Sequence, residues 1–135
     1  MAVSLEIVSP EKLLLSRSVD MVVIPAAEGD MGVLKGHSPM IVTLRGGTIA
    51  LYEGDRITDK LFVSGGFAEV TTERCTVLAT EVLPVGELSR ATADKRLADA
   101  EAAYTVAAKQ GTVAEDAALV SLQAARAMVE AATAG

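Results

Sequence analysis

Residues 25–47 read PAAEGDMGVLKGHSPMIVTLRGG, and strand-like sequence leads into and out of this stretch. It holds the only histidine, His37, and five of the eleven glycines. A helix interior is excluded here, because glycine costs about 1 kcal/mol and proline about 3 kcal/mol inside a helix. Residues 33–34 and 40–42 are apolar enough to bury, so we expect an ordered series of tight turns with polar groups at the surface. Such a loop on a rigid scaffold is a common place for function.

The composition limits the classes of function. Half of the 135 residues are hydrophobic but few are aromatic, which predicts one domain with an aliphatic core. The net charge of −6 argues against binding nucleic acid through phosphates and against docking on anionic lipid. A single cysteine, Cys75, excludes an internal disulfide and a multi-cysteine metal site. No signal peptide and no apolar window of the ~18 residues that a membrane helix needs are found, so we expect a cytoplasmic protein without direct membrane insertion.

The composition changes sharply at residues 84–86. All four prolines and nine of the eleven glycines lie at or before residue 86, and the remainder is rich in alanine. We therefore predict two parts, a β domain over residues 1–86 and a helical part over residues 87–135.

Residues 1–86 read as short strands with turn signals at near-regular spacing. In residues 3–7 the apolar side chains alternate, as in a half-buried strand. The other predicted strands cover residues 12–15, 19–24, 48–52, 61–63, 67–71 and 76–82. This pattern predicts an antiparallel sandwich or barrel.

Residues 87–135 read as two antiparallel helices. Ser89 is the expected N-cap of the first helix, the run from Lys109 to Gly111 is the expected stop, and Thr112 with Glu115 forms the capping box of the second. Two apolar stripes follow helical spacing. Their members are Ala93, Leu97, Ala100, Tyr104 and Ala107 in the first helix, and Ala118, Leu122, Ala125, Val129 and Ala132 in the second.

The alanines in these stripes bury little area, since a buried CH₂ contributes about 0.8 kcal/mol. Two interpretations of the hairpin follow. It is either a plain stabilising element packed on the β domain or a mobile element that docks and opens.

The residues do not form a catalytic constellation. Metal chelation needs several histidines, cysteines or clustered carboxylates. A nucleophile pair would have to join His37 to Ser38 or Cys75, and Cys75 is better explained as a small buried hydrophobe. Glu28 and Asp30 fit acid–base chemistry, cation binding, a solvated turn or an interaction surface, of which we favour the last. We therefore predict a non-catalytic binding or coupling module without a metal or cofactor.

Residues 28–39, EGDMGVLKGHSP, resemble the signature E-G-x-x-G-x-x-x-G-H-x-P of the epsilon subunits of bacterial F-type ATP synthases, whose mitochondrial counterpart is called delta. The likeness extends to residues 5–11, to residues 62–70 (FVSGGFAEV) and to residues 76–79. These segments cover the chain in the family's order and spacing.

The resemblance implies a ten-stranded antiparallel β-sandwich followed by a C-terminal helical hairpin. It implies a rotor subunit of the central stalk that couples c-ring rotation to ATP synthesis in F1 through gamma. Glu28 and Asp30 match positions that face the polar loops of the c ring, and His37 matches one near the contact of gamma with the c ring. The resemblance also implies a peripheral location on the cytoplasmic face of the bacterial inner membrane. We expect the isolated chain to be a monomer.

In many relatives the hairpin extends into the head, contacts the alpha and beta subunits and blocks ATP hydrolysis. Some relatives bind ATP on the folded hairpin through a motif resembling (I/L)-D-x-x-R-A. Here Ser89 stands where the aspartate would be and Thr92 where the arginine would be, between Leu88 and Ala93. We therefore expect a degenerate nucleotide motif and weak inhibition. The alternative is a non-catalytic β-sandwich binding module with a regulatory hairpin.

Overall fold

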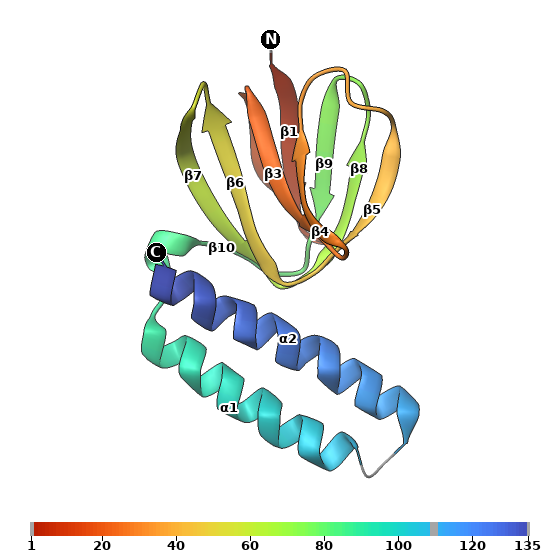
Figure 1. Cartoon of the computed structure of the whole chain (residues 1–135), viewed down its shortest axis with the longest axis vertical. Coiled ribbons are helices and arrows are strands. Elements are labelled where there is room, and N and C mark those ends of the chain that lie inside the picture. Colours follow the sequence, from red (N-terminus) through yellow and green to blue (C-terminus); the bar gives the residue numbers. More distant parts are fainter. Residues whose placement is uncertain (1, 109–110, 135) are drawn as a thin grey trace.

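The computed structural model describes residues 2–108 and 111–134. Within them, ten strands precede a short 3-10 helix and two α-helices (Figure 1). The strands are β1 (Val3–Val8), β2 (Leu13–Val19), β3 (Met21–Ala26), β4 (Gly29–Val33), β5 (Met40–Leu44), β6 (Gly47–Glu53), β7 (Arg56–Val63), β8 (Gly66–Val70), β9 (Arg74–Leu78) and β10 (Val82–Pro84). The helices are η1 (Val85–Glu87), α1 (Arg90–Ala107) and α2 (Thr112–Ala134).

The strands form the two layers of a β-sandwich. One layer has the order β10-β7-β6-β3, with β4 beside β3, and the other has the order β5-β8-β9-β1-β2. The layers are joined where Ala26 of β3 pairs with Leu44 of β5. The predicted sandwich is therefore confirmed. One pair of neighbouring strands, β1 and β9, is parallel, whereas an antiparallel sandwich was predicted. These strands are far apart in the sequence, so no tight hairpin forces them to be antiparallel.

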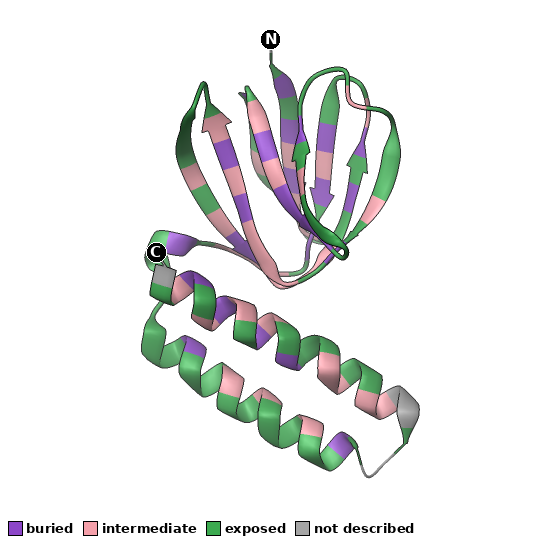
Figure 2. Cartoon of the chain, viewed as in Figure 1, coloured by how far each residue is buried: buried purple, intermediate pink, exposed green. Residues whose placement is uncertain are grey.

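Alternating side chains of both layers build the core (Figure 2). Val3, Leu5 and Ile7 of β1 are fully buried, as their period-2 spacing predicted. The same cluster takes aliphatic side chains from β3, β6, β8 and β9. Cys75 belongs to it, which confirms its expected role as a small buried hydrophobe.

The glycine-rich stretch over residues 25–47 contains more regular structure than its sequence predicted. It holds the end of β3 and all of β4 and β5. The expected burial is confirmed for Val33 but is wrong for Leu34, Met40 and Ile41, which are exposed. Leu34 follows the inward-facing Val33 and leaves the strand on the solvent side. Ile41 pairs with the exposed Glu69 of β8, so it points to the outer face of its layer.

The helices form the predicted antiparallel hairpin. The hydroxyl oxygen of Ser89 accepts a hydrogen bond from the backbone N–H of Thr92 at 3.3 Å, so Ser89 is the N-cap of α1. Gly111 has φ +116°, a conformation that glycine adopts readily. Lys109 and Gln110 lie outside the described residues, as does the side chain of Thr112.

Every member of the two predicted stripes is buried or half-buried. Glu115, expected to cap α2, also joins the two helices. Its Oε1 accepts a hydrogen bond of 3.2 Å from the hydroxyl of Tyr104, and this bond raises the pKa of Tyr104.

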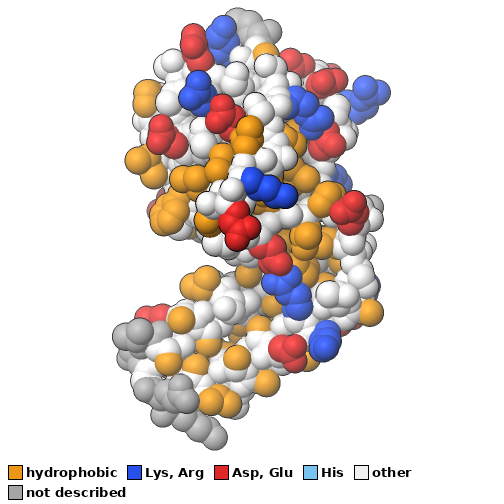
Figure 3. Space-filling view, turned by 180° about the vertical axis from the view of Figure 1, so that it is seen from behind, with side chains coloured by type: hydrophobic (Ala, Val, Ile, Leu, Met, Phe, Trp, Pro, Cys, Tyr) orange, Lys and Arg blue, Asp and Glu red, His pale blue; other side chains and the backbone are white. Residues whose placement is uncertain are grey.

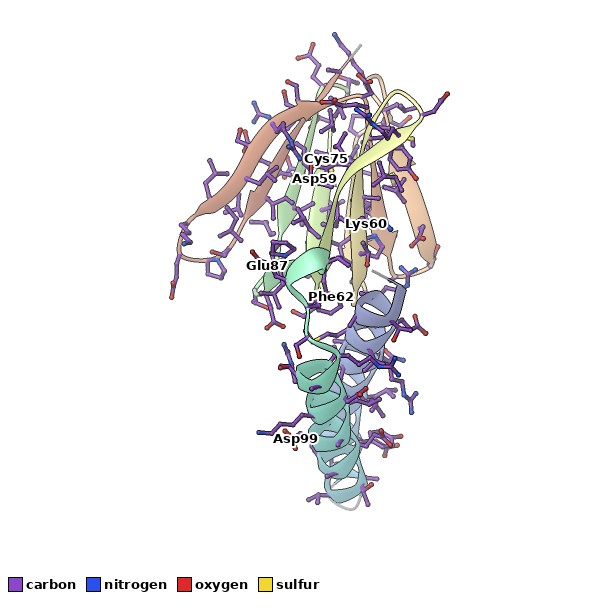
Figure 4. All side chains as sticks on the ribbon, turned by 90° about the vertical axis from the view of Figure 1, so that its left-hand side faces the viewer. Asp59, Lys60, Phe62, Cys75, Glu87 and Asp99 are labelled. Atoms are coloured by element: carbon purple, nitrogen blue, oxygen red, sulfur yellow. The ribbon has the colours of Figure 1, made fainter. Side chains whose placement is uncertain are left out.

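The hairpin docks beneath the sandwich with α2 on the nearer side (Figure 1). A second core cluster at this junction contains Phe62, Val85, Ala93, Met128 and Ala131. The stripe predicted for α2 omitted Met128 and Ala131, because it followed a single line of contact with α1. Helix α2 packs on α1 and on the sandwich, so its apolar arc is wider. Figure 4 shows Phe62 where the sandwich meets the helices.

A close backbone approach sets the spacing between the sandwich and α2. A Cβ atom added to Gly46 would lie 2.6 Å from the Cα atom of Ala124. Real Cβ atoms do not approach other carbon atoms so closely, so only glycine fits at this position. The sequence alone predicted tight turns over residues 25–47, whereas the structure gives Gly46 a packing role.

Candidate functional site

The acidic residues of the predicted site lie at one end of β4. Ala27 and Glu28 form the turn between β3 and β4, and Gly29 at the start of β4 has φ +144°. The side chains of Glu28 and Asp30 are exposed. The turn lies at the end of the sandwich that faces the helices (Figure 1). Two carboxylates are therefore presented to solvent on a hairpin held by five register pairs between β3 and β4.

An arginine anchors this acidic tip. Arg45, just after β5, donates a hydrogen bond of 2.7 Å from Nη2 to Oδ1 of Asp30, and one of 3.2 Å from Nη1 to the backbone oxygen of Ala26. The backbone N–H of Arg45 also donates to the oxygen of Pro25 at 2.9 Å. Asp30 is thus paired within the chain, although its side chain remains 62% exposed. Sequence analysis missed Arg45, whose place beside Asp30 depends on the approach of β5 to β3.

His37 lies at the opposite end of β4. It follows a turn in which its backbone N–H donates to the oxygen of Leu34 at 3.1 Å. The N–H of Gly36 donates to the oxygen of Thr72, so this turn is tied to the β8–β9 connection. Nδ1 of His37 donates to the backbone oxygen of Ser38 at 2.8 Å. The structure therefore does not bring His37 together with Glu28 and Asp30. Glu28 and Asp30 lie at the start of β4, whose five residues span roughly 13 Å, and His37 lies beyond its end.

The four residues expected to form a degenerate nucleotide motif lie at and just before the start of α1, where three of them cap the helix or pack at the junction with the sandwich. They are Leu88, Ser89, Thr92 and Ala93. Ser89 caps α1 through Thr92, whose side chain is exposed. Ala93 is fully buried in the junction cluster, and Leu88 packs against that cluster.

Sequence analysis missed an ion pair next to this motif. Arg96 of α1 donates two hydrogen bonds of 2.8 Å to the two carboxylate oxygens of Glu81, which lies between β9 and β10. The hydrogen bonds to Glu81 raise the pKa of Arg96 above its ordinary value. The pair borders a cavity of about 480 Å³ between the sandwich and the hairpin. No sequence signal joins residues on the two sides of the compositional boundary.

The described residues contain no cluster of three or more His, Cys, Asp or Glu side chains that could hold a metal ion. Cys75 lies fully inside the core, and burial raises the pKa of its thiol to about 11. A thiol that stays protonated and inaccessible is a poor nucleophile.

The sequence matches a known family over most of its length. The family model described as ATP synthase, Delta/Epsilon chain, beta-sandwich domain matches residues 2–85. The chain belongs to the ATP synthase epsilon chain family. The ATP synthase epsilon chain of Granulibacter bethesdensis is 69% identical over 129 residues, which cover 96% of each chain. That of Gluconacetobacter diazotrophicus is 45% identical and covers 98% of this chain and 94% of its own. The epsilon chain is a non-catalytic subunit of the synthase.

Solved structures share the fold. A chain in the structure of the Euglena gracilis mitochondrial ATP synthase, containing OSCP, F1 and the c ring, has a TM-score of 0.78 and 26% identity. The match covers 96% of this chain and 81% of that one. A chain in the Tetrahymena thermophila mitochondrial central stalk and c ring has a TM-score of 0.54 at 11% identity, and covers 65% of this chain and 70% of its own. Among the described residues, neither α1 nor α2 has the apolar length needed to cross a membrane.

Proposed function

We propose that the chain is the central-stalk rotor subunit that couples c-ring rotation to ATP synthesis in F1 through gamma. The observation that carries this proposal is membership of the epsilon chain family along nearly the whole chain. The subunit would work at the periphery of the bacterial inner membrane, on its cytoplasmic face.

The two ends of β4 have separate roles in this proposal. The exposed tip with Glu28 and Asp30 faces the polar loops of the c ring, and His37 lies near the contact of gamma with the c ring. Their separation along β4 is compatible with two distinct points of contact. A charge pair on an exposed rim contributes about 0–1 kcal/mol, so the acidic tip sets register more than affinity.

Reconstitution tests the proposal. Membrane vesicles whose synthase lacks this subunit should regain proton-driven ATP synthesis when the chain is added back. The double variant Glu28→Gln/Asp30→Asn should need a few-fold higher concentration to restore the same rate of synthesis, which corresponds to a loss of about 1 kcal/mol in binding free energy. A matched control exists at the β6–β7 turn, where Glu53 and Asp55 flank Gly54 in the same E-G-D pattern. Failure of the wild-type chain to restore synthesis would contradict the proposal.

We also propose that residues 1–86 form one domain and residues 87–135 a hairpin that inhibits hydrolysis only weakly. Arg126 is the one basic residue of α2, which gives an extended arm little to bind acidic surfaces of the alpha and beta subunits. ATP hydrolysis by the reconstituted enzyme should be similar with the full chain and with a chain ending at residue 86. Much stronger inhibition by the full chain would contradict this part.

A further inference from the structure

The chain turns from β5 into β6 at residues 45–47, which we name the corner. Toward β3, the backbone N–H of Arg45 donates to the oxygen of Pro25 at 2.9 Å. A Cβ atom added to Gly47 would lie 2.7 Å from the Cβ atom of Pro25, so β3 leaves no room for a side chain there. Toward the helices, the corner meets the backbone of Ala124 at the close approach described above. The corner is therefore packed against both β3 and α2.

The side chain of Arg45 ties the corner to the acidic tip. Its guanidinium donates to Oδ1 of Asp30 at 2.7 Å and to the backbone oxygen of Ala26 at 3.2 Å. Ala26 also pairs in register with Leu44, the residue before the corner. The tip, the corner and α2 thus form one continuous series of contacts between segments that are distant in the sequence.

Docking of α2 rests on a short line of contacts. Ala124 meets the corner, and Met128 and Ala131 belong to the junction cluster. These three residues are four and three positions apart, so they lie along one side of the helix. Figure 3 shows from behind the hollow between the sandwich and the part of the hairpin beyond this line. A small shift of the corner therefore acts on a large share of the docking contact.

The ion pair between the tip and the corner is open to competition. The side chain of Asp30 is 62% exposed and that of Arg45 is 44% exposed, so charged groups from solvent reach both. A cationic group that binds Asp30 takes the carboxylate from Arg45. The corner then has more freedom to move, and a close-packed contact tolerates little movement.

The other charges around Arg45 do not replace its partner. Arg45 lines a groove that also contains Arg126 and Glu130 of α2. One of these side chains repels a released guanidinium and the other attracts it. The position of the corner, and not a new ion pair with α2, therefore decides the result.

We propose that Arg45 couples the acidic tip to docking of the hairpin, so that a cationic group that engages Asp30 loosens α2 from the sandwich. Coupling is reciprocal, so docking of α2 weakens the binding of a cation at Asp30 by the same factor. An ion pair with this exposure supports a factor of a few. The coupling is a property of the isolated chain and does not depend on the proposed function. Combined with that function, it makes hairpin docking sensitive to what the tip contacts on the c ring.

Hydrogen exchange of the isolated full chain tests the coupling. Asp30→Asn removes the charge and keeps the shape of the side chain. Amide exchange over residues 122–131 should quicken about threefold, because native-state exchange follows the local opening equilibrium. Arg45→Met should quicken it about fivefold, since both side-chain hydrogen bonds of Arg45 are lost. Exchange in β1 should not change in either variant.

Glu28→Gln is the matched control. Glu28 is exposed in the same tip, and it is not the carboxylate that Arg45 contacts. Its loss changes the net charge as Asp30→Asn does, but exchange in α2 should stay as in the wild type. Equal quickening by Glu28→Gln would overturn the inference. So would unchanged or slower exchange in Asp30→Asn, the latter because it would mean that the released Arg45 binds α2.

Two double-variant cycles test the route. Asp30→Asn/Arg45→Met should exchange as Arg45→Met alone does, because the same ion pair is lost only once. In a Gly46→Val chain, whose α2 no longer rests on the corner, Asp30→Asn should add nothing. A full threefold effect in either background would overturn the route through Arg45 and the corner.

The exchange experiments and the reconstitution fail separately. If the wild type restores ATP synthesis and Asp30→Asn leaves exchange in α2 unchanged, the coupling is overturned and the proposed function stands. If the wild type does not restore synthesis and Asp30→Asn quickens exchange while Glu28→Gln does not, the coupling stands without the proposed function.

Discussion

The sandwich core and the seam between the two helices are both continuous and apolar, but they are built from different side chains. The sandwich core consists mainly of valine, leucine and isoleucine, most of them fully buried. The helix seam is dominated by alanine, with Leu97, Leu122 and Val129 as its larger aliphatic members. Full burial of a large aliphatic side chain contributes about 1.5–3 kcal/mol, against about 0.8 kcal/mol for one methyl group. Burial in the sandwich core therefore contributes most of the stability, while the seam between the two helices contributes less.

The junction between these two regions resembles the core more than the seam. Phe62 is fully buried there, and Met128 is 2% exposed. Both large side chains bridge the two parts, so the junction decides whether the hairpin stays docked.

The largest effect is expected at Phe62. Phe62→Ala should lower the free energy of unfolding by about 3–5 kcal/mol, because it leaves a cavity where the two regions meet. Urea denaturation measures the loss. Phe67→Ala is the control, since Phe67 is 54% exposed and its removal should cost under about 1 kcal/mol. Similar losses for both would mean that the junction is not a core.

The second prediction separates the hairpin from the sandwich. Gly46→Val should displace α2 and lower the free energy of unfolding by about 1–3 kcal/mol, because the new side chain meets the backbone of Ala124. Hydrogen exchange should quicken in α2 and stay slow in β1. Gly86→Ala is the matched control, since a Cβ atom there meets nothing within 4 Å. Unchanged exchange in α2 would contradict the close approach.

The third prediction uses pH to probe the sandwich core alone. Burial raises the pKa of the Cys75 thiol to about 11 in the folded chain, against 9.0 for an unperturbed thiol. The contribution of this thiol to stability is complete below pH 9 and is lost as the pH rises through 11. Between these two values the unfolded chain releases the thiol proton and the folded chain keeps it. Stability should fall by about 1.4 kcal/mol per pH unit from this thiol. Thermal melts of Cys75→Ala should show a shallower decline over the same range, and an identical decline would contradict the prediction.

The smallest effect is expected at the ion pair across the boundary. Arg96→Gln should lower the free energy of unfolding by about 0.5–1 kcal/mol, because both partners are partly exposed. The loss should shrink at high salt. Arg90→Gln is the control, since Arg90 lies 3.7 Å from Asp94 with both side chains more exposed. A larger loss in the control would show that the bidentate geometry adds nothing.

Local patterns predicted the elements of the fold well. The alternation in β1, the N-cap at Ser89 and the helical spacing in α1 and α2 are each expressed within a few neighbouring residues. Family resemblance added the number of strands and the identity of the family. The site was predicted as a set of residues, and Glu28 and Asp30 do share an exposed tip.

Sequence patterns failed to predict burial where the surroundings of a residue come from a segment that is distant in the sequence. Ile41 and Met40 are apolar yet exposed, because β5 lies at the end of its layer and no described helix covers its outer face. Met128 and Ala131 are buried because the sandwich covers a second side of α2.

The sequence by itself determined two parts, a strand-rich part and an alanine-rich helical part, because the period of apolar residues and the placement of proline and glycine act locally. Only the tertiary structure decided that His37 lies at the far end of β4 from Asp30, that Arg45 anchors the acidic tip and that Glu81 pairs with Arg96. It also decided that Phe67, Leu78 and Val8 lie side by side, since strand register pairs Phe67 with Leu78 and Leu78 with Val8. These relations join segments that are distant in the sequence, and no local spacing encodes which strands become neighbours.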